Sequence, residues 1–307
     1  MFIYNTHHGC HKYSEGCKFC YMYSMDKAYG VPQNSSVVTK LKASPKPLAH
    51  YRSGEFKIPS FCRCYVNLSS DTFIEEADAW RDEMWEVFRK RPDVLFSITT
   101  KRIERVAQCL PADWGDGYDN VELITTCENQ ECADKRLPIV RNLPFKHKSI
   151  MVAPFIGPVM LLPYLSTGEF DYVLCEGENY ESNRVLDYDW VLSLHEQCLD
   201  SNTNFIFLGI GNYFRKDGKV YHVKSKDTQH VQAYKAGLNI FKNDILYDLY
   251  YTETQSLQPM PVIAYFNDEK CPECEQFAFC EGCNLCGKCS LKSKALNILK
   301  PLLVEKV

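Results

Sequence analysis

The feature that most constrains the fold is a regular alternation of short apolar runs and longer amphipathic segments between residues 64 and 208. The runs suit buried strands, and the segments of about ten residues between them suit helices. The apolar runs lie at residues 64–68, 94–99, 121–126, 149–153, 171–175 and 205–208, with a further strand candidate at Phe2-Ile3-Tyr4. This order is typical of successive βαβ units and predicts an α/β protein with a parallel sheet.

The number of strands narrows the architecture further. About seven strands in roughly 210 residues are too few for a complete eight-fold barrel. We therefore expect a partial (β/α)6-type TIM barrel over residues 1–212, in preference to a doubly wound sheet. A connecting region at 213–264 and a cysteine-rich metal-binding extension at 265–307 are expected to follow. In either architecture the active residues belong at the carboxyl ends of the strands.

Composition excludes some classes of function. The chain is 45% hydrophobic and 24% charged, which is ordinary for a soluble globular protein. No signal peptide is visible, and no apolar stretch approaches the roughly 20 residues of a membrane span. We therefore expect a cytoplasmic protein without a membrane partner. A net charge of −4 gives no overall electrostatic footprint for nucleic acid.

Sixteen cysteines in a reducing compartment indicate metal binding more than disulfides. Seven of them are scattered among apolar neighbours and are most simply buried small hydrophobic residues. The scattered cysteines are Cys62, Cys64, Cys109, Cys127, Cys132, Cys175 and Cys198. The other nine fall into two tight clusters, and this clustering is what carries the prediction.

The first cluster directly follows the first strand candidate, so it falls on the expected active edge of the sheet. It contains Cys10, Cys17 and Cys20, which we take as the catalytic and metal-ligating residues. An iron–sulfur cubane normally takes four thiolates, and three would leave one metal position open. Open positions are how catalytic metal sites admit a substrate. The neighbouring histidines 7, 8 and 11 are expected to line the site or face solvent.

The second cluster is too dense to consist of packing residues. Its members are Cys271, Cys274, Cys280, Cys283, Cys286 and Cys289. Paired C-x2-C spacings are compatible with a second 4Fe–4S cluster, whose ligands show similar stepped spacing. They are also compatible with a closed structural zinc site. Iron–sulfur is favoured, and both alternatives stay open.

Several short blocks, each at a strand end, resemble the radical S-adenosylmethionine superfamily. The first is the C-x6-C-x2-C-Y motif of Cys10, Cys17 and Cys20-Tyr21, with Ser14-Glu15-Gly16 before the second cysteine, as in a phage- and bacteria-associated branch. The further blocks are residues 66–71, 99–102, 126–130 with Arg136, 154–158, and 175–178 with Arg184. The tail resembles the SPASM extension, which carries auxiliary clusters.

The resemblance implies a specific chemistry. Three thiolates would hold a 4Fe–4S cluster, and the open iron would bind S-adenosylmethionine for reductive cleavage to a 5′-deoxyadenosyl radical. The radical would abstract hydrogen from a substrate, for which a peptide and a nucleic acid both remain open. An electron donor such as flavodoxin or ferredoxin is implied as a partner. The alternative is a non-catalytic zinc or iron–sulfur module for partner or nucleic-acid interaction.

The resemblance also assigns cofactor-binding residues. The turn after the second strand would hold the methionyl end of the cofactor through Ser69, Ser70 and Asp71, with Asp71 as partner of its ammonium group. Glu128 and Arg136 would contact its ribose or carboxylate, and Phe19, Tyr21 and Lys101 belong to the same blocks. Two departures from the pattern, Ala153 and Leu208-Gly209-Ile210-Gly211, concern the expected substrate pocket.

Overall fold

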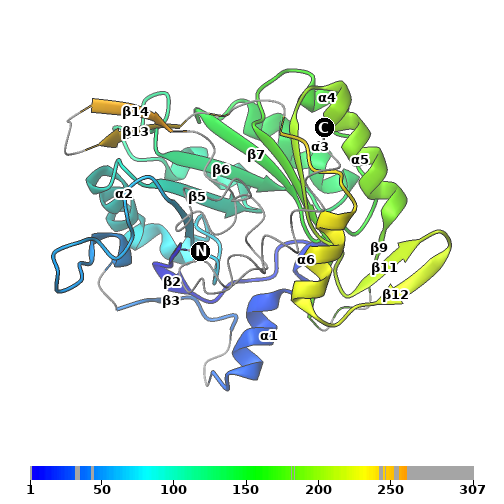
Figure 1. Ribbon diagram of the computed structural model, residues 1–307. Helices are drawn as coiled ribbons and strands as arrows, with labels where there is room; N and C mark the ends of the chain where they lie inside the picture. Colours follow the sequence, from blue (N-terminus) through cyan, green and yellow to red (C-terminus); the bar gives the residue numbers. More distant parts are fainter. Residues whose placement is uncertain are drawn as a thin grey trace.

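Seven parallel strands form the central sheet of the computed structural model, which describes residues 2–31, 35–42, 45–180, 182, 184–241, 245, 247–251 and 256–260. The strands lie side by side in the order in which they occur along the chain (Figure 1). They are β1 (Phe2–Tyr4), β4 (Arg63–Val66), β5 (Leu95–Thr100), β6 (Val121–Thr126), β7 (His147–Val152), β8 (Tyr172–Glu176) and β10 (Asn204–Gly209). The predicted parallel α/β sheet is thus confirmed.

The predicted partial (β/α)6-type TIM barrel is wrong. The sheet has seven strands and is an open half-barrel, in which β1 and β10 are the two edges and do not pair with each other. No strand that the structure describes after β10 joins this sheet, apart from a single bridge between Ile240 and Phe205. The chain turns instead into an antiparallel hairpin of β11 (Tyr213–Lys216) and β12 (Lys219–His222), and β11 pairs with the short β9 (Val185–Asp187).

The helices cover one face of the half-barrel and its carboxyl edge (Figure 1). They are α1 (Tyr21–Ala28), α2 (Arg81–Lys90), α3 (Gln130–Arg141), α4 (Leu162–Leu165), α5 (Tyr188–Asp200) and α6 (Lys226–Lys235). Short 3-10 turns are η1 (Glu15–Cys17), η2 (Lys46–Leu48), η3 (Glu75–Trp80), η4 (Ile103–Arg105) and η5 (Ala107–Cys109). Residues 103–109 form η4 and η5 rather than a longer helix, and α3 continues through Pro138.

The main core lies between the sheet and its covering helices. The rings of Phe88 on α2 and Phe96 on β5 stack with centroids 4.1 Å apart, and Trp85 packs edge-on against Phe88. All three side chains are fully buried. At roughly 1.5–3 kcal/mol for each large apolar side chain removed from water, such contacts are a main source of the stability of this layer.

The opposite face of the sheet carries a buried polar network near the amino ends of the strands. Arg63 on β4 forms an ion pair with Glu122 on β6, and neither side chain is exposed. Glu122 also accepts hydrogen bonds from Ser97 at 2.7 Å and from Ser149 at 2.9 Å. The hydroxyl of Tyr247 accepts a bond from Arg63 Nη2 at 3.1 Å. Four strands of the sheet and a later strand are therefore tied together.

Tyr247 belongs to β13 (Tyr247–Tyr251), which pairs with β14 (Ser256–Met260) in an antiparallel hairpin. This hairpin lies at the end of the sheet remote from α1 (Figure 1). The remaining two-stranded pair is β2 (His7–His8) with β3 (Thr39–Lys40). Among the described residues, no helix is long and apolar enough to span a membrane. The six cysteines of the predicted extension lie outside the described residues.

Candidate functional site

The three cysteines of the first cluster lie on a loop between β2 and α1, at the carboxyl edge of the sheet. The backbone fixes the start of this loop, since Gly9 N donates to Ser69 O at 3.1 Å and Cys10 N donates to Ser35 O at 2.9 Å. Gly9 has a φ of 95°, and a Cβ there would collide with the backbone of Val37. A residue with a side chain would therefore displace the loop at its first cysteine.

The three thiols are close enough to influence one another. Burial raises the pKa of the Cys10 thiol to about 12, while the Arg102 guanidinium opposes this shift. Burial also raises the pKa of Cys20, and Lys101 and the amides of the first turn of α1 oppose it. The charge of a Cys17 thiolate raises the pKa of both other thiols. The loop therefore gathers three coupled thiols beside two cations.

The described residues contain no ready-made site for a single metal ion. No three of their His, Cys, Asp or Glu side chains converge closely enough to hold one ion. Cys10, Cys17 and Cys20 are thiolate donors on one loop, and both zinc and iron–sulfur clusters take such donors.

Glu128, directly after β6, connects the cysteine loop to the half-barrel. Its carboxylate accepts a hydrogen bond from Ser14 Oγ at 2.5 Å and forms ion pairs with Arg136 at 2.5 Å and Lys101 at 3.2 Å. Although burial alone would raise its pKa, Lys101, Arg136 and Ser14 lower the pKa of Glu128 to about 2. Glu128 is therefore an ionised, fully buried anchor.

The absence of a side chain at Gly16 allows the loop to pack closely against Glu128. A Cβ at residue 16 would lie 2.5 Å from Glu128 Oε1 and 2.6 Å from its Cγ. Gly16 packs against the buried carboxylate of Glu128, and Cys17 is the next residue. This packing therefore fixes the position of the Cys17 thiol. Glu128 and Arg136 were predicted to contact a cofactor, and the structure assigns both to this anchor.

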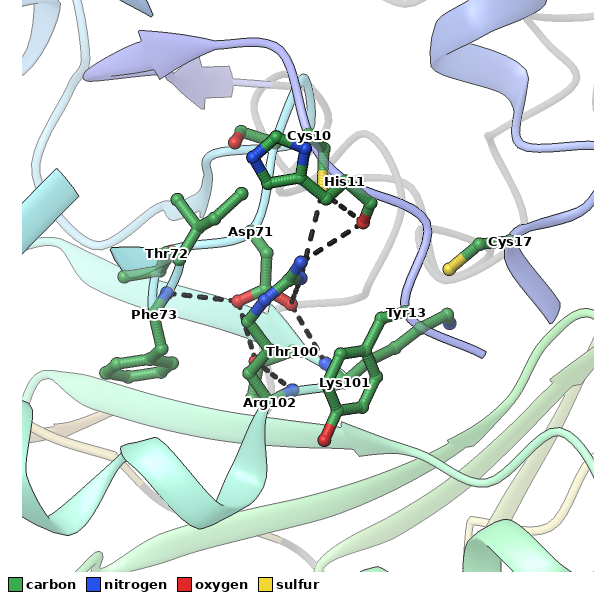
Figure 2. A network of polar contacts seen from close by, with 12 residues as sticks. Cys10, His11, Tyr13, Cys17, Asp71, Thr72, Phe73, Thr100, Lys101 and Arg102 are labelled. Atoms are coloured by element: carbon green, nitrogen blue, oxygen red, sulfur yellow. Dashed lines mark hydrogen bonds and ion pairs between the residues drawn. The ribbon is translucent and has the colours of Figure 1, made fainter. Parts of the chain in front are cut away.

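Asp71 is the second anchor, and Figure 2 shows it at the centre of a polar network below Cys10. Its carboxylate accepts hydrogen bonds from Phe73 N at 3.0 Å, Thr100 Oγ1 at 2.8 Å and Lys101 N at 3.1 Å. Arg102 lies 3.4 Å from Asp71 Oδ2. Four donors thus occupy the carboxylate predicted to bind the ammonium group of a cofactor.

Arg102 connects Asp71 to the cysteine loop. Its guanidinium donates to Cys10 Sγ at 3.7 Å and to the His11 carbonyl at 3.1 Å (Figure 2). The predicted serines also support the loop, since Ser69 Oγ donates to the His7 carbonyl at 3.1 Å and Ser70 Oγ donates to the Gly9 carbonyl at 2.5 Å. The turn after β4 therefore holds the backbone that carries the thiols.

A third anchor comes from the segment after β8. Arg184 forms a two-point ion pair with Glu178 and donates to the Glu15 carbonyl at 3.2 Å. Its guanidinium lies 5.4 Å from the centroid of the Phe19 ring. Phe19 is therefore held beside Cys20, and the hydroxyl of Tyr21 donates to the Leu68 carbonyl on the other side of the loop.

The three histidines of the loop region have protein partners. His7 is buried and bonds to the Asp71 carbonyl at 3.1 Å, and His8 pairs with Asp26 at 2.9 Å. His11 is exposed and pairs with Glu76.

All predicted site residues in the described part of the chain gather around the cysteine loop. The residues missing from the predicted set are Ser14, Gly16, Arg102, Glu178 and Arg184. Each of them stands in one of the short blocks that follow strands, so the signal was present in the sequence. Their function as supports of the loop depends on contacts between distant segments, which spacing does not reveal.

Fold and site together define an α/β protein with an open parallel half-barrel whose carboxyl edge carries a loop with three anchored thiols. The family model described as "Protein of unknown function (DUF5131)" matches residues 2–243, and the chain belongs to this family. No curated protein and no solved structure matches the chain.

This comparison corrects the predicted family. The resemblance to the radical S-adenosylmethionine superfamily is wrong as an assignment, because the family model that covers the half-barrel is DUF5131. The short blocks that carried the resemblance are the segments that anchor the cysteine loop. Their order along the chain reflects the order of the parallel strands, whose ends all meet at one edge.

Proposed function

We propose that the protein is an enzyme in which Cys10, Cys17 and Cys20 hold a 4Fe–4S cluster and S-adenosylmethionine is the second cofactor. The observation that carries this proposal is that the three cysteines lie on one loop, where Arg102 donates to Cys10 Sγ at 3.7 Å and the buried carboxylates of Asp71 and Glu128 anchor the loop. The chemistry of these residues supports the cluster, and S-adenosylmethionine is proposed as the ligand of the iron that three thiolates leave open. Soft thiolates are the ligands that iron–sulfur clusters require.

Cys10, Cys17 and Cys20 would hold the cluster, which would supply one-electron reduction of the S-adenosylmethionine sulfonium with an electron from an external reductant. The residues of the chain would position this reaction. Arg102 and Lys101 would offset the negative charge of the thiolates, which burial otherwise disfavours. Asp71 and Glu128 would keep both cations in place.

The location of the loop also supports the proposal. Ligands of parallel sheets bind at the carboxyl ends of the strands, because the polar groups of several loops meet there. Here the ends of β4, β5, β6 and β8 all contribute an anchor to the loop. A thiol group that served only to stabilise a local fold would need no such support from four strands.

The test is metal analysis combined with cofactor cleavage on anaerobically reconstituted full-length protein. We expect dithionite and S-adenosylmethionine to yield 5′-deoxyadenosine, and Cys17→Ala to lose about four irons per chain together with this activity. Cys109→Ala, which changes a buried cysteine on η5 next to Trp85, should retain both. Zinc without iron, and no cleavage, would instead support a non-catalytic zinc module and refute the proposal.

A further inference from the structure

A row of cations and aromatic rings surrounds the outer side of the cysteine loop. Lys12 Nζ lies 5.2 Å from the ring centroid of Tyr23, Lys18 Nζ lies 5.3 Å from that of Phe19, and Lys135 Nζ lies 5.5 Å from that of Tyr13. Lys12, Lys18 and Lys135 are exposed, and we call them the lysine rim.

Contacts with the cysteine loop hold the lysine rim in place. Lys12 Nζ donates to the Lys18 carbonyl at 2.9 Å, and Lys135 on α3 lies over the ring of Tyr13, the residue that follows Lys12 in the chain. Within the described part of the chain, none of the three lysines has an ion pair with a carboxylate. Two nearby acids are already engaged, Glu15 by Arg184 and Glu104 by the hydroxyl of Tyr13. The rim therefore keeps its positive charge although the chain as a whole is acidic.

Two exposed tyrosines continue the row beyond Phe19. Tyr21 is 40% exposed and Tyr180 is 41% exposed, with ring centroids 6.2 Å apart. Tyr180 has a φ of 64°, which is unusual for an aromatic residue. Asn212 holds this conformation, since its backbone N donates to the Glu178 carbonyl at 2.9 Å and its side chain donates to the Tyr180 carbonyl. The fold thus holds a strained residue whose large ring stays in solvent, a pattern found at functional sites.

We propose that the lysine rim and the tyrosine pair bind a single-stranded nucleic acid. Proteins that bind single strands combine cations that track the phosphates with aromatic rings on which bases stack. Both elements occur here along one edge, next to the loop of the proposed cluster. The idea that this nucleic acid is the substrate of the enzyme rests on the proposed function. The idea that it binds to this surface does not.

An acidic protein is the competing partner, since it also seeks exposed cations. The aromatic rings favour the nucleic acid, because charge complementarity alone gives no reason to hold Tyr180 in a strained conformation. Stacking on an exposed ring does give such a reason. Removal of the Tyr180 ring should therefore weaken the binding of a nucleic acid but not the binding of an acidic protein.

The test measures binding of a fluorescently labelled oligo(dT) of about 16 nucleotides to the full-length protein by anisotropy, over about 50 to 200 mM salt. Three phosphate contacts predict a slope of log K against log salt of about −2, at about 0.7 per contact. Lys12→Gln with Lys18→Gln should bring the slope to about −0.7. The matched control is Lys90→Gln with Lys146→Gln, which removes two exposed lysines at the amino edge of the sheet and should change nothing.

Tyr180→Ala should weaken binding roughly five- to a hundred-fold without changing the salt slope, because stacking involves no counterions. Equal slopes for the rim variant and the control would overturn the proposal. So would displacement of oligo(dT) by poly-glutamate at equal charge concentration, which would identify an acidic protein as the partner.

Cleavage of S-adenosylmethionine without substrate is measured on the same samples. Binding without cleavage counts against the proposed function alone, and cleavage without binding counts against the lysine rim alone.

Discussion

Gly16 is the residue on which contact between the cysteine loop and the half-barrel depends. A methyl group there would lie within 3 Å of three side-chain atoms of Glu128, all of them buried. We therefore predict that Gly16→Ala lowers the free energy of unfolding by about 1–3 kcal/mol, the usual cost of overpacking. It should also reduce the iron content after reconstitution, because Cys17 would move with the loop.

Gly157→Ala is the matched control for this substitution. Gly157 also lacks a positive φ, and its added Cβ would meet Asn129 Cβ at an ordinary 3.5 Å. Urea unfolding and iron analysis of both variants check the prediction. Equal stability and equal iron content in the two proteins would contradict it.

The ionised carboxylate of Glu128 makes a pH-dependent contribution to stability. Its pKa of about 2 lies below the ordinary value of 4.5, because Lys101 and Arg136 outweigh the effect of burial. A depressed pKa means that the contribution is fully present above about pH 4.5 and is lost as the pH falls toward 2. At about 1.36 kcal/mol per pH unit, the full contribution is roughly 3 kcal/mol.

We predict that Glu128→Gln destabilises the protein by about 3–5 kcal/mol near neutral pH, since the buried Arg136 loses its counter-charge. The difference from the wild type should narrow below pH 4.5. Urea unfolding of both proteins across this pH range is the measurement, with Glu131→Gln, an exposed acid on α3, as control. A difference that does not vary with pH would show that charge is not the cause.

At the scale of elements, β13 closes the polar face that the half-barrel leaves open. Tyr247 and Leu249 on this strand are fully buried, and Tyr247 bonds to the buried ion pair of Arg63 and Glu122. An ion pair taken out of water is stable only when its remaining donors are satisfied. The strand therefore supplies both apolar cover and a polar partner.

Tyr247→Phe should cost about 1–3 kcal/mol, because it removes a hydrogen-bond partner from a buried guanidinium and leaves the ring in place. Tyr164→Phe removes an exposed bond to Asp134 of 3.3 Å and should cost less than about 0.5 kcal/mol. Urea unfolding compares the two variants. Hydrogen exchange should further show faster opening of β4 and β6 in Tyr247→Phe only.

At the scale of the whole molecule, some strands could be predicted from the sequence and others could not. The strand at residues 121–126 was predicted with its correct limits, because β-branched Val121, Ile124 and Thr125 favour a strand. The β13 strand lies in a stretch of mixed polar and aromatic residues without a period, so no pattern marks it. Arg63 was likewise not assigned to a strand, since a buried cation becomes intelligible only with Glu122 beside it.

The candidate site likewise has features that the sequence predicted and features that it did not. The spacing of Cys10, Cys17 and Cys20 indicated the thiol loop, because thiolates must cluster to share metal. The hydrogen bonds of Ser69 and Ser70 to the backbone of the loop could not be inferred. Short polar side chains bond equally well to a ligand or to the backbone, and their choice depends on a loop some sixty residues away. The low number of strands indicated an incomplete barrel, but no pattern indicated the hairpin of β11 and β12 that follows β10.

The dependence of the half-barrel on β13 leads to a prediction about the whole chain. The family match ends at residue 243, yet Tyr247 and Leu249 beyond it have no exposed surface. A chain ending at residue 243 would expose Arg63 and Glu122 to partial solvent and lose two large buried side chains, worth roughly 1.5–3 kcal/mol each. A chain ending at residue 260 keeps both. We therefore predict that the shorter chain unfolds at least about 3 kcal/mol more easily in urea, although both contain the same cysteine loop. Equal stabilities would mean that the half-barrel holds its buried ion pair without β13, and that the matched region alone is the folding unit.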